Sequence, residues 1–151
     1  MRGLAITRLG VVMSAREVGL LRDRALRILG SAKSSLVAGD YDIAAFLADQ
    51  AIQLYLKSAT FQLAGEIPRV HSVRQLFQIF GAAIQRQDEI EEFTRKNRSL
   101  IIRLEDAYIN SRYVPREYDR DEASELVTFT KRAVNFVKNL EHKASAKKTR
   151  R

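Results

Sequence analysis

The stretch YDIAAFLADQAIQLYLKSATFQLA, residues 41–64, decides the fold class of this 151-residue chain. Its small and apolar residues recur at helical spacing. One stripe comprises Ala44, Leu47, Ala48, Ala51, Ile52, Tyr55 and Ala59, and it is widened by Ile43, Phe46, Leu54, Phe61 and Leu63. A helix that is apolar this far round is buried on several sides or lies at an interface. We therefore expect residues 41–64 to form the central helix of a bundle.

Residues that start and stop helices divide the rest of the chain. A Ser or Asp at the N-cap accepts hydrogen bonds from free backbone N–H groups, and glycine or proline ends a helix. The expected caps are Ser14, Asp40, Ser72, Asp88 and Asp121, and the expected stops are Gly39, Gly65 and Pro115. They predict helices over 15–38, 41–64, about 73–84, about 88–113 and 121 to about 142. No alternating run predicts a strand, so the sequence predicts an all-α, up-and-down bundle of four long helices and one short helix.

Charge is unevenly placed along the chain, whose formal net charge is +8. The segment KASAKKTRR, residues 143–151, has five basic residues and no acidic one. We expect residues 1–13 to be an N-terminal extension that need not be rigid, 14–142 to be the bundle, and 143–151 to be a basic tail. Such a tail either attracts phosphate in a salt-sensitive way or is a solvated segment that aids solubility.

The composition argues against several classes of protein and site. Cysteine is absent, which excludes disulfides and thiolate metal sites, and no His and carboxylate spacing suggests a metal or a cofactor. No apolar run approaches the roughly 20 residues that span a bilayer. Arg8 interrupts the apolar N-terminus and no cleavage pattern follows, so we expect a cytoplasmic protein without a signal peptide. Either Met1 or Met13 can be the start of translation.

The stretch LEDAYINSRYVP, residues 104–115, contains the strongest candidate for a functional residue. Arg112 lies one residue past the apolar stripe, near the end of the expected fourth helix. A guanidinium there is either held by a carboxylate of another helix or faces an anion at the rim of the bundle. His71, directly before a helix cap, is either a local hydrogen-bonding residue or a catalyst. His142 is expected to be a surface histidine.

Three stretches, in this order and spacing, resemble the HEPN family (higher eukaryotes and prokaryotes nucleotide-binding domain). They are AFLADQAIQLYLKSATFQLAGE (45–66), HSVRQLF (71–77) and LEDAYINSRYVP (104–115). The resemblance covers roughly residues 14–142 and suggests a small stand-alone member of prokaryotic or archaeal type. It implies an all-α bundle, commonly a homodimer, often paired with a minimal nucleotidyltransferase in a toxin–antitoxin-like module.

Many members of this family are metal-independent ribonucleases, with an arginine followed four to six residues later by histidine. Arg112 matches the arginine, but Glu117, Tyr118 and Asp119 stand where the histidine would be. The candidate catalytic residues are Arg112 and His71, and the candidate ligand or dimer contacts are Arg112, Tyr113, Ser111, Tyr108, Asn110 and His71.

The resemblance therefore implies a non-catalytic binding or interaction protein, with a nucleotide or RNA and a nucleotidyltransferase as possible partners. A metal-independent ribonuclease with a degenerate site is the first alternative. A nucleic-acid-binding module that uses the basic tail is the second.

Overall fold

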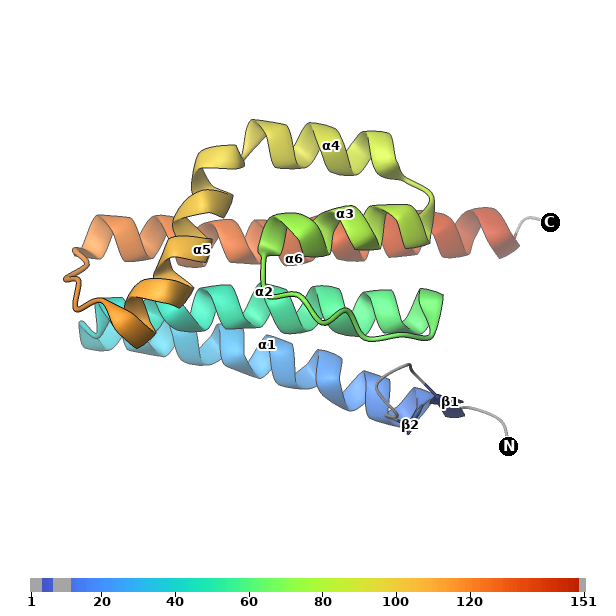
Figure 1. Cartoon of the computed structure of the whole chain (residues 1–151), viewed down its shortest axis with the longest axis horizontal. Helices are drawn as coiled ribbons and strands as arrows, with labels where there is room; N and C mark the ends of the chain where they lie inside the picture. The colour runs from blue at the N-terminus through green and yellow to red at the C-terminus, as the bar shows by residue number, and fades with distance from the viewer. Residues whose placement is uncertain (1–3, 7–11, 150–151) are drawn as a thin grey trace.

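The chain forms a bundle of helices around α2, as expected (Figure 1). The computed structural model describes residues 4–6 and 12–149. Its helices are α1 (Ala15–Ala38), α2 (Tyr41–Ala64), α3 (Val73–Ile84), α4 (Gln87–Lys96), α5 (Arg98–Tyr113) and α6 (Arg120–Thr149). The prediction of an all-α bundle is confirmed, with six helices among the described residues instead of five.

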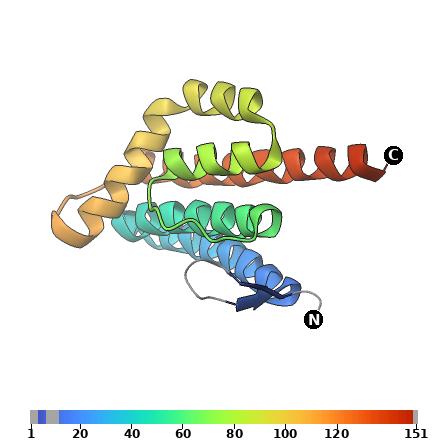
Figure 2. The ribbon, with the colours of Figure 1, turned by 45° about the vertical axis from the view of Figure 1, so that its right-hand side comes forward.

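Helix α2 occupies the centre because it is apolar around most of its circumference. It packs against α1, α3, α5 and α6, and the two views of Figures 1 and 2 agree on this arrangement. Its alanines Ala44, Ala48 and Ala51 are fully buried, which permits close approach of the neighbouring helices. The prediction that residues 41–64 form the central helix is confirmed.

Several predicted helix ends are confirmed by their hydrogen bonds and backbone angles. Ser14 and Glu17 form the full capping box, with bonds of 2.9 and 3.2 Å between each side chain and the other residue's backbone N–H. Ser72 Oγ accepts from the backbone N–H of Gln75 at 3.2 Å. Gly39 and Gly65 end α1 and α2 with φ angles of 86° and 76°, a region in which a side chain is strained.

The predicted long helix over 88–113 is wrong, because the chain turns at Asn97. Asn97 has φ −113° and ψ 21°, and its Nδ2 donates to the carbonyl of Phe93 at 2.8 Å. Its Oδ1 accepts from Arg132 of α6 at 3.3 Å. Helix α4 therefore lies over α3, while α5 runs in a new direction and packs on α2 (Figure 1).

Three predicted side-chain caps are also wrong. Asp40 precedes α2 but makes no side-chain cap hydrogen bond. Helix α4 begins after Arg86, with no side-chain cap, so Asp88 lies inside the helix. Helix α6 is capped by Asp119 instead of Asp121: Asp119 Oδ1 accepts from the N–H of Glu122 at 2.8 Å. In a second hydrogen bond, Glu122 Oε1 accepts from the backbone N–H of Asp119 at 3.3 Å. The two residues therefore form a capping box.

Both ends of the described chain carry secondary structure. Helix α6 continues to Thr149, and Ala144 packs against the core. At the other end β1 (Leu4–Ile6) pairs antiparallel with β2 (Val12–Ser14). Strands of three residues are too short to show an alternating pattern. Met13 is buried and packs with Val18 and Phe61.

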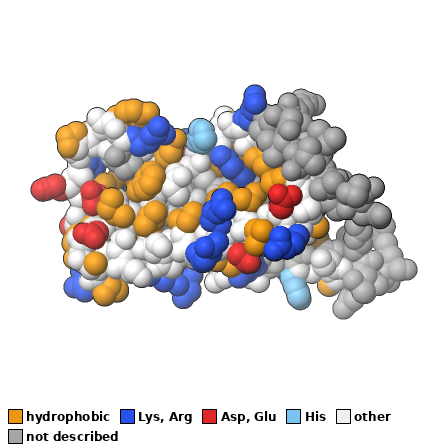
Figure 3. Space-filling view, turned by 90° about the horizontal axis from the view of Figure 1, so that it is seen from below, with side chains coloured by type: hydrophobic (Ala, Val, Ile, Leu, Met, Phe, Trp, Pro, Cys, Tyr) orange, Lys and Arg blue, Asp and Glu red, His pale blue; other side chains and the backbone are white. Residues whose placement is uncertain are grey.

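The outer face of the bundle beside α1 is of mixed character. Figure 3 shows Lys and Arg side chains interspersed with hydrophobic ones and a few acidic ones. This mixture is typical of a protein surface, where isolated apolar residues are common. A more specific arrangement of charges lies where α5 meets α2.

Candidate functional site

Four side chains from three parts of the fold meet around Tyr108. We call Lys57, His71, Tyr108 and Arg112 the Tyr108 cluster. The His71 ring stacks on the Tyr108 ring, with centroids 5.8 Å apart and an interplanar angle of 19°. Arg112 Nη1 donates to the Tyr108 hydroxyl at 2.6 Å. The structure thus brings together the two residues that the sequence predicted as catalytic candidates.

Helix α5 positions Arg112 by its own geometry. Tyr108 and Arg112 are four residues apart and so lie on the same face of the helix. The guanidinium carbon is 5.3 Å from the ring centroids of both Tyr108 and Tyr113. Contacts of this kind are favourable cation–π interactions. Aromatic rings therefore orient Arg112, and its positive charge is not neutralised by an ion pair with a described residue.

The same helix fixes the loop that carries His71. Glu105 accepts from the Ser72 hydroxyl at 2.6 Å and from the backbone N–H of Arg74 at 3.1 Å. The Arg74 side chain adds an ion pair of 3.3 Å with this carboxylate. Because Glu105 lies one helical turn before Tyr108, one helix both holds the loop and carries the aromatic ring on which His71 stacks.

Lys57 faces the Nδ1 atom of the His71 ring, and burial lowers the pKa of this lysine. Lys57 Nζ lies 3.5 Å from His71 Nδ1, at the long limit of a hydrogen bond. An ammonium has only donors, so Nδ1 is the acceptor and Nε2 carries the proton of the neutral ring. Desolvation, followed by the charges of Lys57 and Arg112, lowers the pKa of His71. Lys57, His71 and Arg112 therefore all present N–H donors.

Asp49 is a buried carboxyl group near this cluster, and the sequence analysis did not identify it. It is fully buried in α2, and Gln53 and Gln50 donate to its Oδ2 at 2.6 and 3.2 Å. Burial raises the pKa of Asp49 to about 7, and the charges of Glu105 and Lys57 also act on it. The available signal was one acidic residue within the broad apolar surface of residues 41–64.

The other predicted site residues lie near the cluster but are less directly involved. Tyr113 is 69% exposed beside Arg112. Asn110 Nδ2 instead donates to the Tyr118 hydroxyl at 3.4 Å. Ser111 lies on α5, but its side chain is outside the described part of the structure. His142 is exposed on α6 and does not join the cluster.

The positions at which the ribonuclease motif would place histidine have other contacts. Asp119 caps α6, and Tyr118 lies under the Arg116 guanidinium with its centroid 4.0 Å from the guanidinium carbon. Neither position supplies a proton-transfer group to Arg112. The His71 ring is the imidazole that the fold brings to this end of α5.

An apolar edge adjoins the cluster at the end of α5. Ile109, Tyr113 and Val114 are 50%, 69% and 48% exposed. Large apolar side chains that gather on a surface often mark a site of protein contact.

The described residues include neither a cluster of metal-ligating side chains nor a helix of membrane-spanning character. No group of three or more His, Cys, Asp or Glu side chains within 4–6 and 12–149 is arranged to hold a metal ion. No described helix is long and apolar enough to cross a membrane.

Both the sequence and the fold of this chain are similar to those of known proteins. The sequence model of the HEPN domain matches residues 18–140. A solved structure, described as the crystal structure of TT1696 from Thermus thermophilus, is similar with a TM-score of 0.66 and 26% sequence identity. The match covers 82% of this chain and 97% of that chain. No curated protein matches the sequence.

Proposed function

The chain belongs to the HEPN domain family, and from this premise we propose that it is a HEPN-type binding protein that holds a phosphate-bearing ligand at the Tyr108 cluster. The ligand is a nucleotide or a segment of RNA. The observation that carries the proposal is that His71 and Arg112 contact the same ring, that of Tyr108, while Lys57 lies against His71.

The chemistry of the cluster suits a phosphate group. Lys57 and Arg112 supply positive charge, and His71 supplies an N–H donor from Nε2. Charge-assisted hydrogen bonds of this kind are the usual means of binding phosphate. The exposed ring of Tyr113 beside Arg112 offers a surface on which a base can stack.

The protonation of His71 favours binding over catalysis. A general base needs an unprotonated nitrogen that faces the substrate. In His71, Nδ1 faces Lys57, and a charged Lys57 makes Nδ1 an acceptor and leaves the proton on Nε2. The cluster is therefore better suited to hold an anion than to remove a proton from a ribose hydroxyl.

The proposal is tested by the binding of ATP and of a labelled single-stranded RNA to the Arg112→Ala variant. Loss of a hydrogen bond to a charged group is worth about 1.5–3 kcal/mol, so we expect affinity to fall about 10- to 100-fold. Arg103→Ala is the matched control, because Arg103 lies on the same helix but pairs with Glu125 at 3.1 Å. Equal affinity of the two variants for both ligands would contradict the proposal.

We extend the proposal to the assembly in which the protein acts. The protein is a homodimer and the HEPN partner of a minimal nucleotidyltransferase in a toxin–antitoxin-like module. The apolar edge formed by Ile109, Tyr113 and Val114 supports a protein contact beside the cluster. Such a contact places Arg112 and Tyr113 close to a subunit interface.

A metal-independent ribonuclease is the second candidate, and the proximity of His71 to Arg112 favours it. For this activity His71 must replace the missing histidine of the motif, which requires the ring to release Lys57. Purified protein is incubated with transfer RNA and messenger RNA in the presence of EDTA. The binding proposal predicts intact RNA; cleavage that is lost in both Arg112→Ala and His71→Ala would establish the ribonuclease instead.

A further inference from the structure

Across α2 from the Tyr108 cluster, we infer a second binding site, for a small organic anion with an apolar body. Tyr55 and Lys57 are two residues apart on α2 and so point to opposite sides of the helix. Lys57 faces His71, whereas Tyr55 lines a cavity between α2, α1 and α6. The two sites share no residue, and this inference does not depend on the proposed function.

The cavity is large enough for a small molecule. Its volume is about 620 Å³, within the range of roughly 300–1,000 Å³ that small-molecule sites occupy. Most of its lining residues belong to the C-terminal half of α2 and the C-terminal part of α6. Side chains of four helices contribute to its walls, so it is a feature of the packed bundle.

One charged pair in the cavity is already neutralised. Arg22 donates to both carboxylate oxygens of Glu141, at 3.0 and 2.8 Å, and to Gln62 Oε1 at 2.8 Å. This fork geometry fixes the guanidinium and satisfies most of its donors. Arg22 and Glu141 therefore form a rigid wall of the cavity and add no net charge to it.

The remaining charge of the cavity is positive. Lys138 and His142, one turn apart on α6, line the same cavity. Neither has an ion pair or a hydrogen bond with another described residue. Their N–H groups are therefore available to a carboxylate, sulfonate or phosphate group, which selects an anion as the ligand.

Apolar side chains line another part of the cavity. Leu63 is 46% exposed there, and Ile84 and Ala144 lie beside it. Covering exposed apolar surface removes it from water and favours binding. This wall selects an anion with an apolar body over a bare inorganic ion.

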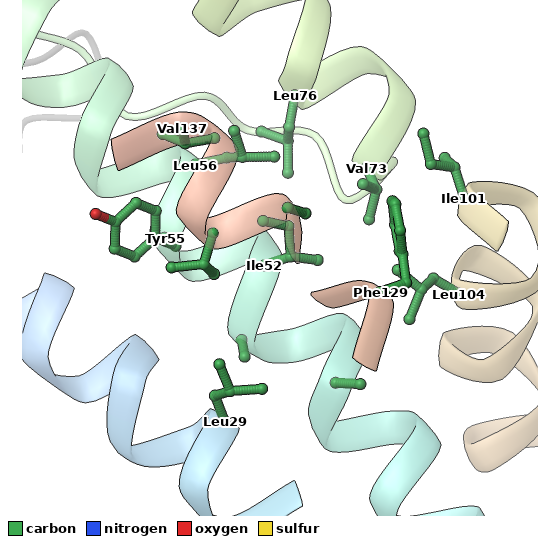
Figure 4. Packing of buried hydrophobic residues seen from close by; sticks show 14 of the residues in the cluster. Leu29, Ile52, Tyr55, Leu56, Val73, Leu76, Ile101, Leu104, Phe129 and Val137 are labelled. Carbon is green, nitrogen blue, oxygen red and sulfur yellow. The ribbon is translucent and has the colours of Figure 1, made fainter. Parts of the chain in front are cut away.

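Tyr55 forms the inner wall of the cavity. Its side chain is fully buried, and its hydroxyl lies beside Arg22 and Glu141, although no hydrogen-bond partner meets it at normal geometry. Buried tyrosine hydroxyls usually have such a partner. Figure 4 shows the oxygen pointing away from the labelled side chains of the core. The Arg22 guanidinium carbon lies 5.2 Å from the ring centroid and holds it in place.

The site is tested with 8-anilinonaphthalene-1-sulfonate, an aromatic anion whose fluorescence rises in an apolar environment. We expect saturable binding to the full chain that sodium octanoate displaces and that inorganic phosphate does not. The Lys138→Ala/His142→Ala double variant and Leu63→Glu should each bind the probe at least tenfold more weakly. Lys131→Ala, an exposed position on α6 outside the cavity, should bind it as the wild type does.

Each result bears on the inference. Thermal unfolding of every variant establishes that it is folded before the probe is added. Unchanged binding in both cavity variants would overturn the inference, as would equal weakening in Lys131→Ala, since the probe would then bind elsewhere or by net charge alone. Displacement by phosphate alone would overturn the requirement for an apolar body.

Discussion

The Arg112 guanidinium lies against two aromatic rings and has no carboxylate partner among the described residues. The sequence allowed either a carboxylate partner or an exposed anion site. The structure places Tyr108 and Tyr113 around the guanidinium instead of a carboxylate. A guanidinium oriented in this way keeps its charge available to a ligand.

His71 and Arg112 were identified as candidates from the sequence because their residue types and positions are informative. Lys57 and Glu105 were not assigned to a site, since their roles depend on how α2 and α5 pack. Asp49 was missed for the same reason: its raised pKa comes chiefly from burial by neighbouring helices. Contacts between helices are not encoded in any local pattern.

Asp49 should make stability depend on pH. Its pKa is about 7 in the folded protein, against 3.8 in the reference state. Because the folded form binds the proton more tightly, protonation of Asp49 stabilises the folded state. This stabilisation is fully present below pH 3.8 and is lost as pH rises through 7. The loss is about 1.4 kcal/mol per pH unit and ends near the folded pKa of about 7. Between pH 5 and 8 it therefore amounts to about 2–3 kcal/mol.

The Asp49→Asn variant removes this titration while keeping the shape of the side chain. Urea unfolding at pH 5 and pH 8 measures the effect. The wild type should lose about 2–3 kcal/mol more than the variant over this range. An equal change in the free energy of unfolding for both proteins would show that Asp49 is ionised without cost.

At the scale of elements, the sequence predicted helix ends correctly where a glycine adopts positive φ or a serine caps the helix. Gly39 and Gly65 adopt positive φ, and Ser14 caps α1, as their residue types indicate. The break at Asn97 was not predicted, because the helical spacing of apolar residues continues through it. Tertiary packing of α4 on α3 and of α5 on α2 sets the break.

The packing of α4 on α3 depends on Gly81. A Cβ atom at this position would lie 2.9 Å from Cγ1 and 3.2 Å from Cβ of Ile90. Ile90 is 1% exposed and has little room to move. Gly81→Val should therefore lower the free energy of unfolding by about 1–3 kcal/mol, the usual range for overpacking.

Gly30 provides the matched control on α1. A Cβ atom there meets no atom within 4 Å, and valine is a better helix former than glycine. Gly30→Val should leave stability unchanged or slightly raised in the same denaturation experiment. Equal destabilisation by the two substitutions would show that the close approach at Gly81 is not what matters.

At the scale of the whole molecule, the order of three sequence stretches was enough to predict the HEPN fold, which the family match over 18–140 confirms. Those stretches predicted the central helix and three of the four residues of the Tyr108 cluster, namely His71, Tyr108 and Arg112. They carried no information on the cavity beside Tyr55, whose walls come from four separate helices.

The apolar edge at the end of α5 predicts the oligomeric state. Light scattering with size-exclusion chromatography at micromolar concentration should give about twice the chain mass of 17.2 kDa. Ile109→Glu should give the monomer, because it places a charge in the proposed contact. Val37→Glu, at an 89% exposed position on α1, should remain dimeric. A monomeric wild type would contradict the proposed assembly.

The central claim, that the Tyr108 cluster holds a phosphate-bearing ligand, is tested most directly by nuclear magnetic resonance of the isotope-labelled protein during titration with ATP. The account predicts saturable shifts of the His71 ring and Arg112 side-chain signals, which Arg112→Ala abolishes at His71 and Arg103→Ala preserves. Shifts confined to the cavity beside Tyr55, or no shift at His71 and Arg112 at saturating ATP, would contradict it.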